Sequence, residues 1–364
     1  MTEIFVVSGL YGLLGVLVAA REGDARARRG LFWSLGLLAA LAILAAWNFE
    51  KEIFEQKFAS EFAFNLWSGE ESPRDHSTFI LQALINAPAF WLTERWWAAI
   101  GVNVALVIWL FAVLWRLRPE ISWMAFTPAI VNFSLFSLRD PIVMGVIFLA
   151  VLSFCDPRVG RRLAGQGVAA LALLAVRPEL AVLLVLANAI RSAWDVRHLA
   201  IAPVLLLLFG CVFVAGLMRA PHALGLQAVP VVWDLPLLFS DFFEARAGRW
   251  SIDEGGGSNI LAGRLAEFGF FPRYAVQLVS FFILPLPFEI TRLPLAFAFL
   301  DSVVFCYVAW RFHQEAPKAA KIFFWIYVAA VSLFSSNYGN VFRMRLPAYG
   351  ILLAGLLRGA RARE

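Results

Sequence analysis

Three short polar islands interrupt a strongly apolar chain, and each island carries arginine. They are Arg139-Asp140-Pro141, Arg177-Pro178-Glu179 and residues 337–347, which include Arg343 and Arg345. A charged side chain is costly in hydrocarbon and usually marks a functional position there. Guanidinium is always charged and forks onto phosphate oxygens. These residue types therefore predict a site that gathers arginines around a phosphate group.

The last island offers the densest set of candidate ligands. On a regular helix, Arg343 and Arg345 would point to different sides. Asn337, Gly339 and Asn340 beside them favour an irregular backbone, in which both arginines could converge on one diphosphate. We therefore assign Asn337, Asn340, Arg343 and Arg345 to substrate binding. The alternative is that both arginines extend toward the membrane surface from a helix end.

The other two islands admit a similar choice. Arg139 and Asp140 are candidate ligand contacts, but they could also satisfy each other while Pro141 begins the next helix. Arg177 and Glu179 are also assigned to the site, and an ion pair across the proline turn is their alternative role.

Candidate proton acceptors lie elsewhere in the chain. Asp75 and His76 precede an apolar segment, and imidazole titrates near working pH, so this pair could act as general base. Asp75 or Ser77 could instead cap the following helix. Glu289 follows Pro287 at the edge of an apolar stretch and is a further catalytic candidate, and His222 competes as a base.

Composition places the chain in a membrane. Of 364 residues, 61% are hydrophobic and 16% are charged, with 14 Trp and 34 Phe. A soluble domain carries about 25% charged residues, so this chain has too little polar surface for water. We expect an all-α, polytopic integral membrane protein with about 10–11 transmembrane helices, including short hairpins with outward charged tips. The expected spans are 2–20, 31–48, 96–115, 120–137, 141–155, 199–217, 290–312, 322–336 and 345–360. Residues 163–190 are expected to form a hairpin, and 271–288 a dipping or surface helix.

The basic residues set the expected orientation. They cluster at 21–29, 158–162, 191–197, 311–321 and 358–363, which the positive-inside rule places in the cytoplasm. The three islands then become the outward tips of three hairpins on one face. Residues 49–95 and 218–270 are predicted as extracytoplasmic loops of a single domain, 1–364, with the N-terminus outside and the C-terminus cytoplasmic. Residues 2–20 look like a retained span.

Other function classes receive little support. The basic residues flank hydrophobic spans and form no single surface for nucleic acid. The three cysteines and four histidines have no metal-ligand spacing, so we predict no metal and no cofactor.

The quoted motifs resemble a known family. Ser137-Leu138-Arg139-Asp140, Arg177-Pro178, Pro285-Leu286-Pro287-Phe288 and Asn337-Tyr338-Gly339 with Arg343 and Arg345 are similar to segments of Wzy-type oligosaccharide repeat-unit polymerases. More distantly they resemble other membrane glycosyltransferases of the GT-C class. The resemblance covers roughly residues 60–350. Phe288 and Met344 depart from it, since tryptophan and histidine are frequent there.

The resemblance implies an activity and its partners. Such enzymes join glycan units carried on undecaprenyl diphosphate at the outer face of the bacterial inner membrane, as in O-antigen and exopolysaccharide biosynthesis. Arg139, Arg177, Arg343 and Arg345 would then stabilise the departing diphosphate. Membrane lipid surrounds such a protein, and a chain-length regulator or a flippase would be a partner.

Two other functions stay open at this point. One is a GT-C transferase that uses a polyprenyl-phosphate sugar, with Asp75 as its acidic loop residue. The other is a non-enzymatic transporter or flippase of lipid-linked glycan.

Overall fold

The computed structural model describes most of the chain between residues 61 and 361. Described are 61, 63–70, 80–135, 139–156, 158–195, 270–290, 293–332 and 338–361, with isolated positions before residue 41. The helical fraction is 89% and no strand occurs among the described residues, which confirms the all-α class for them. The predicted spans 2–20, 31–48 and 199–217 lie largely or wholly outside them.

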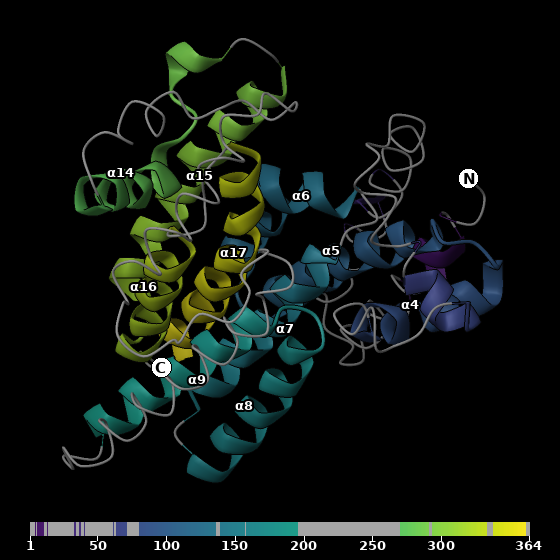
Figure 1. Cartoon of the computed structure of the whole chain (residues 1–364), viewed down its shortest axis with the longest axis horizontal. Helices are drawn as coiled ribbons and strands as arrows, with labels where there is room; N and C mark the ends of the chain where they lie inside the picture. Colours follow the sequence, from purple (N-terminus) through teal and green to yellow (C-terminus); the bar gives the residue numbers. More distant parts are fainter. Residues whose placement is uncertain are drawn as a thin grey trace, which may run out of the picture. The chain divides into compact units, whose positions relative to one another are not determined.

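Apart from residues 196–269, which lie outside the described residues, few residues separate one helix from the next (Figure 1). Their bounds are α4 Ile80–Thr93, α5 Ala98–Leu117, η2 Pro119–Phe126, α6 Pro128–Ser134, α7 Asp140–Phe154, α8 Val159–Leu174, α9 Pro178–Asp195, α14 Phe270–Ile283, η4 Pro287–Glu289, α15 Leu293–Glu315, α16 Lys318–Ser332 and α17 Tyr338–Arg361.

Contacts divide the chain into two compact units. Unit 1 comprises Met1–Ala181, Val303–Lys321 and Arg345–Glu364, and unit 2 comprises Val182–Ser302 and Ile322–Met344. All four boundaries fall inside helices, namely α9, α15, α16 and α17. The single domain expected from the sequence stays a prediction.

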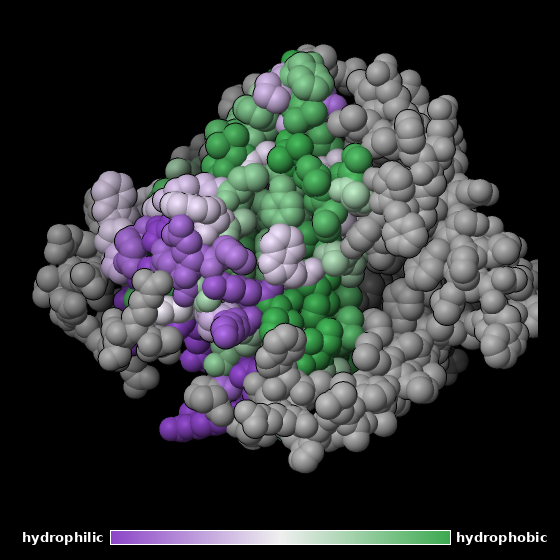
Figure 2. Space-filling model, turned by 90° about the vertical axis from the view of Figure 1, so that its left-hand side faces the viewer, coloured by the Kyte–Doolittle hydropathy of each residue, from purple (hydrophilic) through white to green (hydrophobic). Residues whose placement is uncertain are grey.

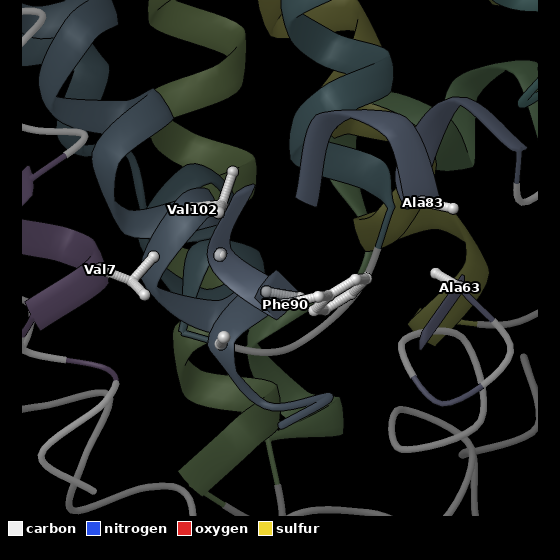
Figure 3. Close-up of a cluster of buried hydrophobic side chains, with 8 residues drawn as sticks. Val7, Ala63, Ala83, Phe90 and Val102 are labelled. Atoms are coloured by element: carbon white, nitrogen blue, oxygen red, sulfur yellow. The ribbon is translucent and has the colours of Figure 1, made fainter. Parts of the chain in front are cut away.

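Unit 1 is built around α5. This helix is apolar on every side and 14 of its 20 residues are buried, as expected for a helix surrounded by protein. At its N-terminal end a cluster of small and apolar side chains joins it to α4 (Figure 3). Phe90 of α4 lies between Val7 and Val102 on one side and Ala63 and Ala83 on the other.

The segment predicted as one span over 120–137 is instead broken. It forms the 3-10 helix η2 and the seven-residue helix α6, joined at Thr127. Thr127 is extended (φ −60°, ψ 150°) because it precedes Pro128, and its hydroxyl caps α6 by accepting from the Ile130 amide at 3.4 Å. The rings of Phe111 and Phe126, 5.1 Å apart, hold η2 against α5.

Within the hairpin predicted over 163–190, the structure shows the two expected helices and the break between them. Their packing on each other and the outward tip stay predictions. Helix α8 ends at Leu174 and α9 begins at Pro178, so the break falls at Arg177-Pro178. Arg177 precedes a proline, which disfavours continuing the helix through it.

Two helices in the described part of the chain are long and apolar enough to cross a membrane, Ala98–Leu117 and Leu295–Glu315. The first is mostly buried, whereas only 33% of the second is buried within the protein. On the face shown in Figure 2, hydrophobic residues form a continuous band and hydrophilic residues gather beside it.

Candidate anion-binding site

The first side chains of the candidate site come from the start of α7. Asp140 is the first residue of this helix and is buried, with Pro141 in the same turn. A carboxylate is favoured there because the free amides of a helix N-terminus carry partial positive charge. Arg139 directly precedes the helix and is half-buried.

The turn between α8 and α9 places Arg177 beside Asp140. Helix α8 runs antiparallel to α7. Gln166 of α8 bonds to Ala150 of α7, and Arg177, further along the chain, bonds to Asp140, which lies earlier in α7. Gly165 permits the close approach, since a Cβ there would strike the Ser153 side chain. At the end of α8, Arg177 Nη2 donates to Asp140 Oδ1 at 3.1 Å.

Helix α17 runs parallel to α7 and brings Arg345. A Cβ on Gly350 would lie 2.7 Å from the carbonyl oxygen of Met144, so the two backbones touch there. Eight residues further along both helices, Arg358 Nη2 donates to the Leu152 carbonyl at 2.7 Å. In both contacts the α17 residue lies 206 positions after its α7 partner (350 − 144 and 358 − 152), so the two helices run in the same direction. The same register places Arg345 level with Arg139.

The start of α7, the turn after α8 and the first half of α17 therefore place four residues at one level of unit 1, which we call the arginine layer: Arg139, Asp140, Arg177 and Arg345. Three of the four predicted arginine positions and one predicted carboxylate belong to it. It comprises three guanidinium groups and one carboxylate. Burying charge among apolar helices costs free energy unless it is compensated, and Arg177 and Asp140 compensate each other in part.

Arg345 is the most deeply placed member of the layer. Its side chain is fully buried (0% exposed), and its guanidinium lies 5.5 Å from the centroid of the Phe305 ring. Phe305 is held edge-on by Tyr349, one turn beyond Arg345 on α17, with centroids 5.2 Å apart. A cation over an aromatic face is attracted by its quadrupole, and a planar guanidinium suits this better than an ammonium.

Arg343 does not share that position. The structure places Tyr338–Arg361 in one helix, so the irregular backbone expected around Arg343 and Arg345 is absent over 338–345. Side chains two residues apart on a helix point in directions that differ by about 200°. Arg343 and Arg345 therefore point to different sides of α17 and do not form one clamp. Arg343 is half-buried.

Several other predicted residues lie beyond what the structure describes. Asp75, His76 and Asn337 lie outside the described residues, as does the alternative base His222. Glu179 and Asn340 lie in the first turns of α9 and α17, but their side chains are outside the described set.

Glu289, the remaining catalytic candidate, has a local structural role in unit 2. It is buried, and its Oε2 accepts a hydrogen bond from the Leu286 amide at 2.6 Å. This contact closes the short turn η4, Pro287–Glu289. A carboxylate that caps its own turn is less available as a base.

The opposite end of α17 has different chemistry. There Arg118 donates to Glu120, to Glu315 and to the Leu356 carbonyl, while Arg311 pairs with Glu315 at 2.8 Å. Burial alone would raise the pKa of the Glu120 carboxyl, but the Arg118 hydrogen bond and charge outweigh it, and the pKa lies below its ordinary value. Positive and negative side chains alternate in this network, which connects α5, α15 and α17.

Sequence reasoning missed Asp301. This carboxylate is fully buried in α15, in the middle of an apolar run and one turn before Phe305. Its signal was present, because an ionisable residue within an apolar span is a functional candidate by default.

Comparison with known proteins yields no match to a family model, to a curated protein or to a solved structure. Among the described residues, no group of three His, Cys, Asp or Glu side chains could hold a metal ion.

Proposed function

We propose that this chain is a polytopic membrane glycosyltransferase of the polysaccharide-polymerase kind, acting on oligosaccharides carried on undecaprenyl diphosphate. The arginine layer binds the diphosphate of the lipid-linked donor. The observation that carries the proposal is the common register of α7, α8 and α17, which brings arginines from three separate polar islands to one level.

The proposed chemistry is displacement at the anomeric carbon. A hydroxyl of the acceptor sugar attacks, and the lipid diphosphate leaves with the bonding electron pair. Negative charge grows on the departing diphosphate, where the guanidinium groups of Arg177 and Arg345 stabilise it more strongly than in the ground state. Asp75 or His76 takes the proton of the acceptor hydroxyl in this proposal.

The proposed location is the bacterial inner membrane. The apolar composition and the poorly buried helix Leu295–Glu315 support membrane integration. Parallel α7 and α17 support the predicted topology, in which both helices run from the outer face toward the cytoplasm and their arginine ends share one side. The Arg118 network would then lie at the cytoplasmic side, where the basic loops are.

Polymerisation in vitro tests the proposal. Purified protein in nanodiscs is incubated with lipid-linked repeat units, and product length is measured. Replacing Arg177 and Arg345 together with alanine should lower the rate about 100-fold or more, as removing a transition-state donor does in other enzymes. Arg161→Ala, an exposed change on α8, is the control.

The outcome separates the rival functions. Unchanged polymer length in the double variant contradicts the diphosphate site. Products extended by a single sugar from a polyprenyl-phosphate donor would identify the transferase alternative. Movement of lipid-linked glycan across a vesicle membrane, without new glycosidic bonds, would identify a transporter.

A further inference from the structure

One face of α15 is exposed from end to end and changes character along its length. Its members are Phe297, Leu300, Val303, Tyr307 and Trp310, spaced by three or four residues as one side of a helix requires. Each is between 43% and 58% exposed. The face begins with aliphatic and phenyl groups, continues with tyrosine and tryptophan, and ends at exposed His313 and Gln314.

The two aromatic residues at its end are extended by a third from another element. Trp123 of η2 lies with its ring centroid 6.1 Å from that of Tyr307, which in turn lies 6.2 Å from that of Trp310. The Trp123 indole donates to the Glu120 carbonyl at 3.1 Å, so its polar edge turns toward the charged end of unit 1. We call Trp123, Tyr307 and Trp310 the aromatic trio.

Charges lie directly beyond the trio. Arg311 and Glu315 on α15, with Arg118 and Glu120, form the ion-pair network described above. Apolar surface, then amphipathic rings, then charge is the order met on leaving a bilayer, because tyrosine and tryptophan favour the headgroup region. Monomeric soluble proteins rarely expose so long a continuous apolar face.

We infer that this face of α15 contacts lipid directly, with the aromatic trio in the headgroup layer of one leaflet and Phe297 deep in hydrocarbon. Thirteen residues separate Phe297 from Trp310, about 20 Å along a helix. The hydrocarbon core is about 30 Å thick, so a helix near the membrane normal places Phe297 past its middle. The inference rests on the membrane half of the proposed function and is independent of what the arginine layer binds.

Spin labels measure directly how deep each position of this α15 face lies in the membrane. After Cys155, Cys211 and Cys306 are replaced, single cysteines are introduced at Leu300, Val303, Tyr307, Trp310 and Gln314, labelled and reconstituted in nanodiscs. Oxygen concentrates in hydrocarbon and a nickel chelate stays in water. Accessibility to oxygen should be greatest at 300 and 303, and accessibility to nickel should rise from 307 to 314.

Two outcomes would overturn the inference, and they differ in what else they affect. Labels at 300 and 303 that are shielded from both reagents would mean that protein covers the face, which leaves the proposed function intact. Labels at 300 and 303 that nickel reaches as readily as 314 would place the face in water and remove the membrane half of the proposal too.

A second measurement avoids the cysteine-free background. In the native chain, lipids brominated near the headgroup should quench part of the tryptophan fluorescence. Trp123→Phe combined with Trp310→Phe should reduce the quenched fraction, and an unchanged fraction would contradict the assignment of the trio to the headgroup layer.

Discussion

Arg345 is the residue whose surroundings are most specific. Its guanidinium is buried and lies over Phe305, a ring that Tyr349 fixes from the side. Both aromatic residues act on the site through Arg345, so they are positioning residues. Sequence spacing could single out Arg345 as a charge in an apolar segment, but it gave Arg343 equal rank. Only the regular helix through both positions separates them.

Replacing Arg345 with lysine should separate charge from shape. Lysine keeps the charge but loses the planar stack on Phe305 and the forked donors. We expect transfer activity to fall at least about tenfold, corresponding to one lost charge-assisted hydrogen bond. Activity is measured with lipid-linked substrate in nanodiscs. Full activity in the lysine variant would mean that only the net charge matters.

Asp140 and Arg177 test whether pairing or ligand binding explains the second island. Their ion pair is largely shielded from solvent, because the Asp140 side chain is 3% exposed and the Arg177 side chain 15%. Asp140→Asn removes one partner and should lower the free energy of unfolding by about 3 kcal/mol. It also removes the hydrogen bond that Arg177 donates to the Asp140 carboxylate, so affinity for a diphosphate lipid should stay equal or rise.

Arg177→Gln provides the complementary result. It should lower both stability and diphosphate affinity, because the guanidinium serves both partners. Loss of stability with unchanged affinity would show that Arg177 belongs to the fold alone. Thermal unfolding in detergent and lipid binding are measured on the same preparations.

At the scale of helices, sequence patterns located most elements but not their register. Apolar length predicted α5, α7 and α15 within a few residues, and Pro178 predicted the hairpin break. The prediction failed at 120–137, where Thr127 and Pro128 interrupt an apolar run. The offset of 206 residues between α7 and α17 is set by Gly350 against the Met144 backbone, a distant contact that local sequence does not encode.

Gly350→Ala should therefore disturb the arginine layer from a distance. A Cβ there would lie 2.7 Å from the Met144 carbonyl oxygen and force α17 away from α7. We expect lower activity and lower thermal stability, although Gly→Ala in a helix otherwise stabilises by about 1 kcal/mol.

Gly145→Ala is the matched control, since it lies on α7 and a Cβ there meets nothing within 4 Å. It should leave activity unchanged and raise stability slightly. Equal behaviour of the two variants would contradict the close packing of α7 on α17. Both are compared by thermal unfolding and by product length.

For the whole molecule, composition alone predicted the helical class and a membrane environment. It could not predict which charged side chains pair with one another. In the structure Arg118 pairs with Glu120 and Glu315 at one end of unit 1, and Arg177 pairs with Asp140 at the other. The location of Asp75 and His76 relative to the layer lies outside the described residues.

The proposed orientation predicts the behaviour of fusions. Green fluorescent protein attached after Glu364 should fluoresce, because the C-terminus is proposed to be cytoplasmic. Alkaline phosphatase inserted at 71–75 or at 222 should be active, because both segments are proposed to lie outside. Inactive phosphatase at both sites, with a non-fluorescent C-terminal fusion, would contradict the orientation.

The central claim is that guanidinium groups from α7, the α8–α9 turn and α17 hold one lipid-borne diphosphate. The most direct measurement is equilibrium binding of undecaprenyl diphosphate and of undecaprenol to the protein in nanodiscs. Arg177→Gln and Arg345→Gln should each weaken binding of the diphosphate about tenfold or more, while the alcohol is unaffected and Arg161→Gln changes neither affinity. Equal affinity of all variants for the diphosphate would contradict the claim.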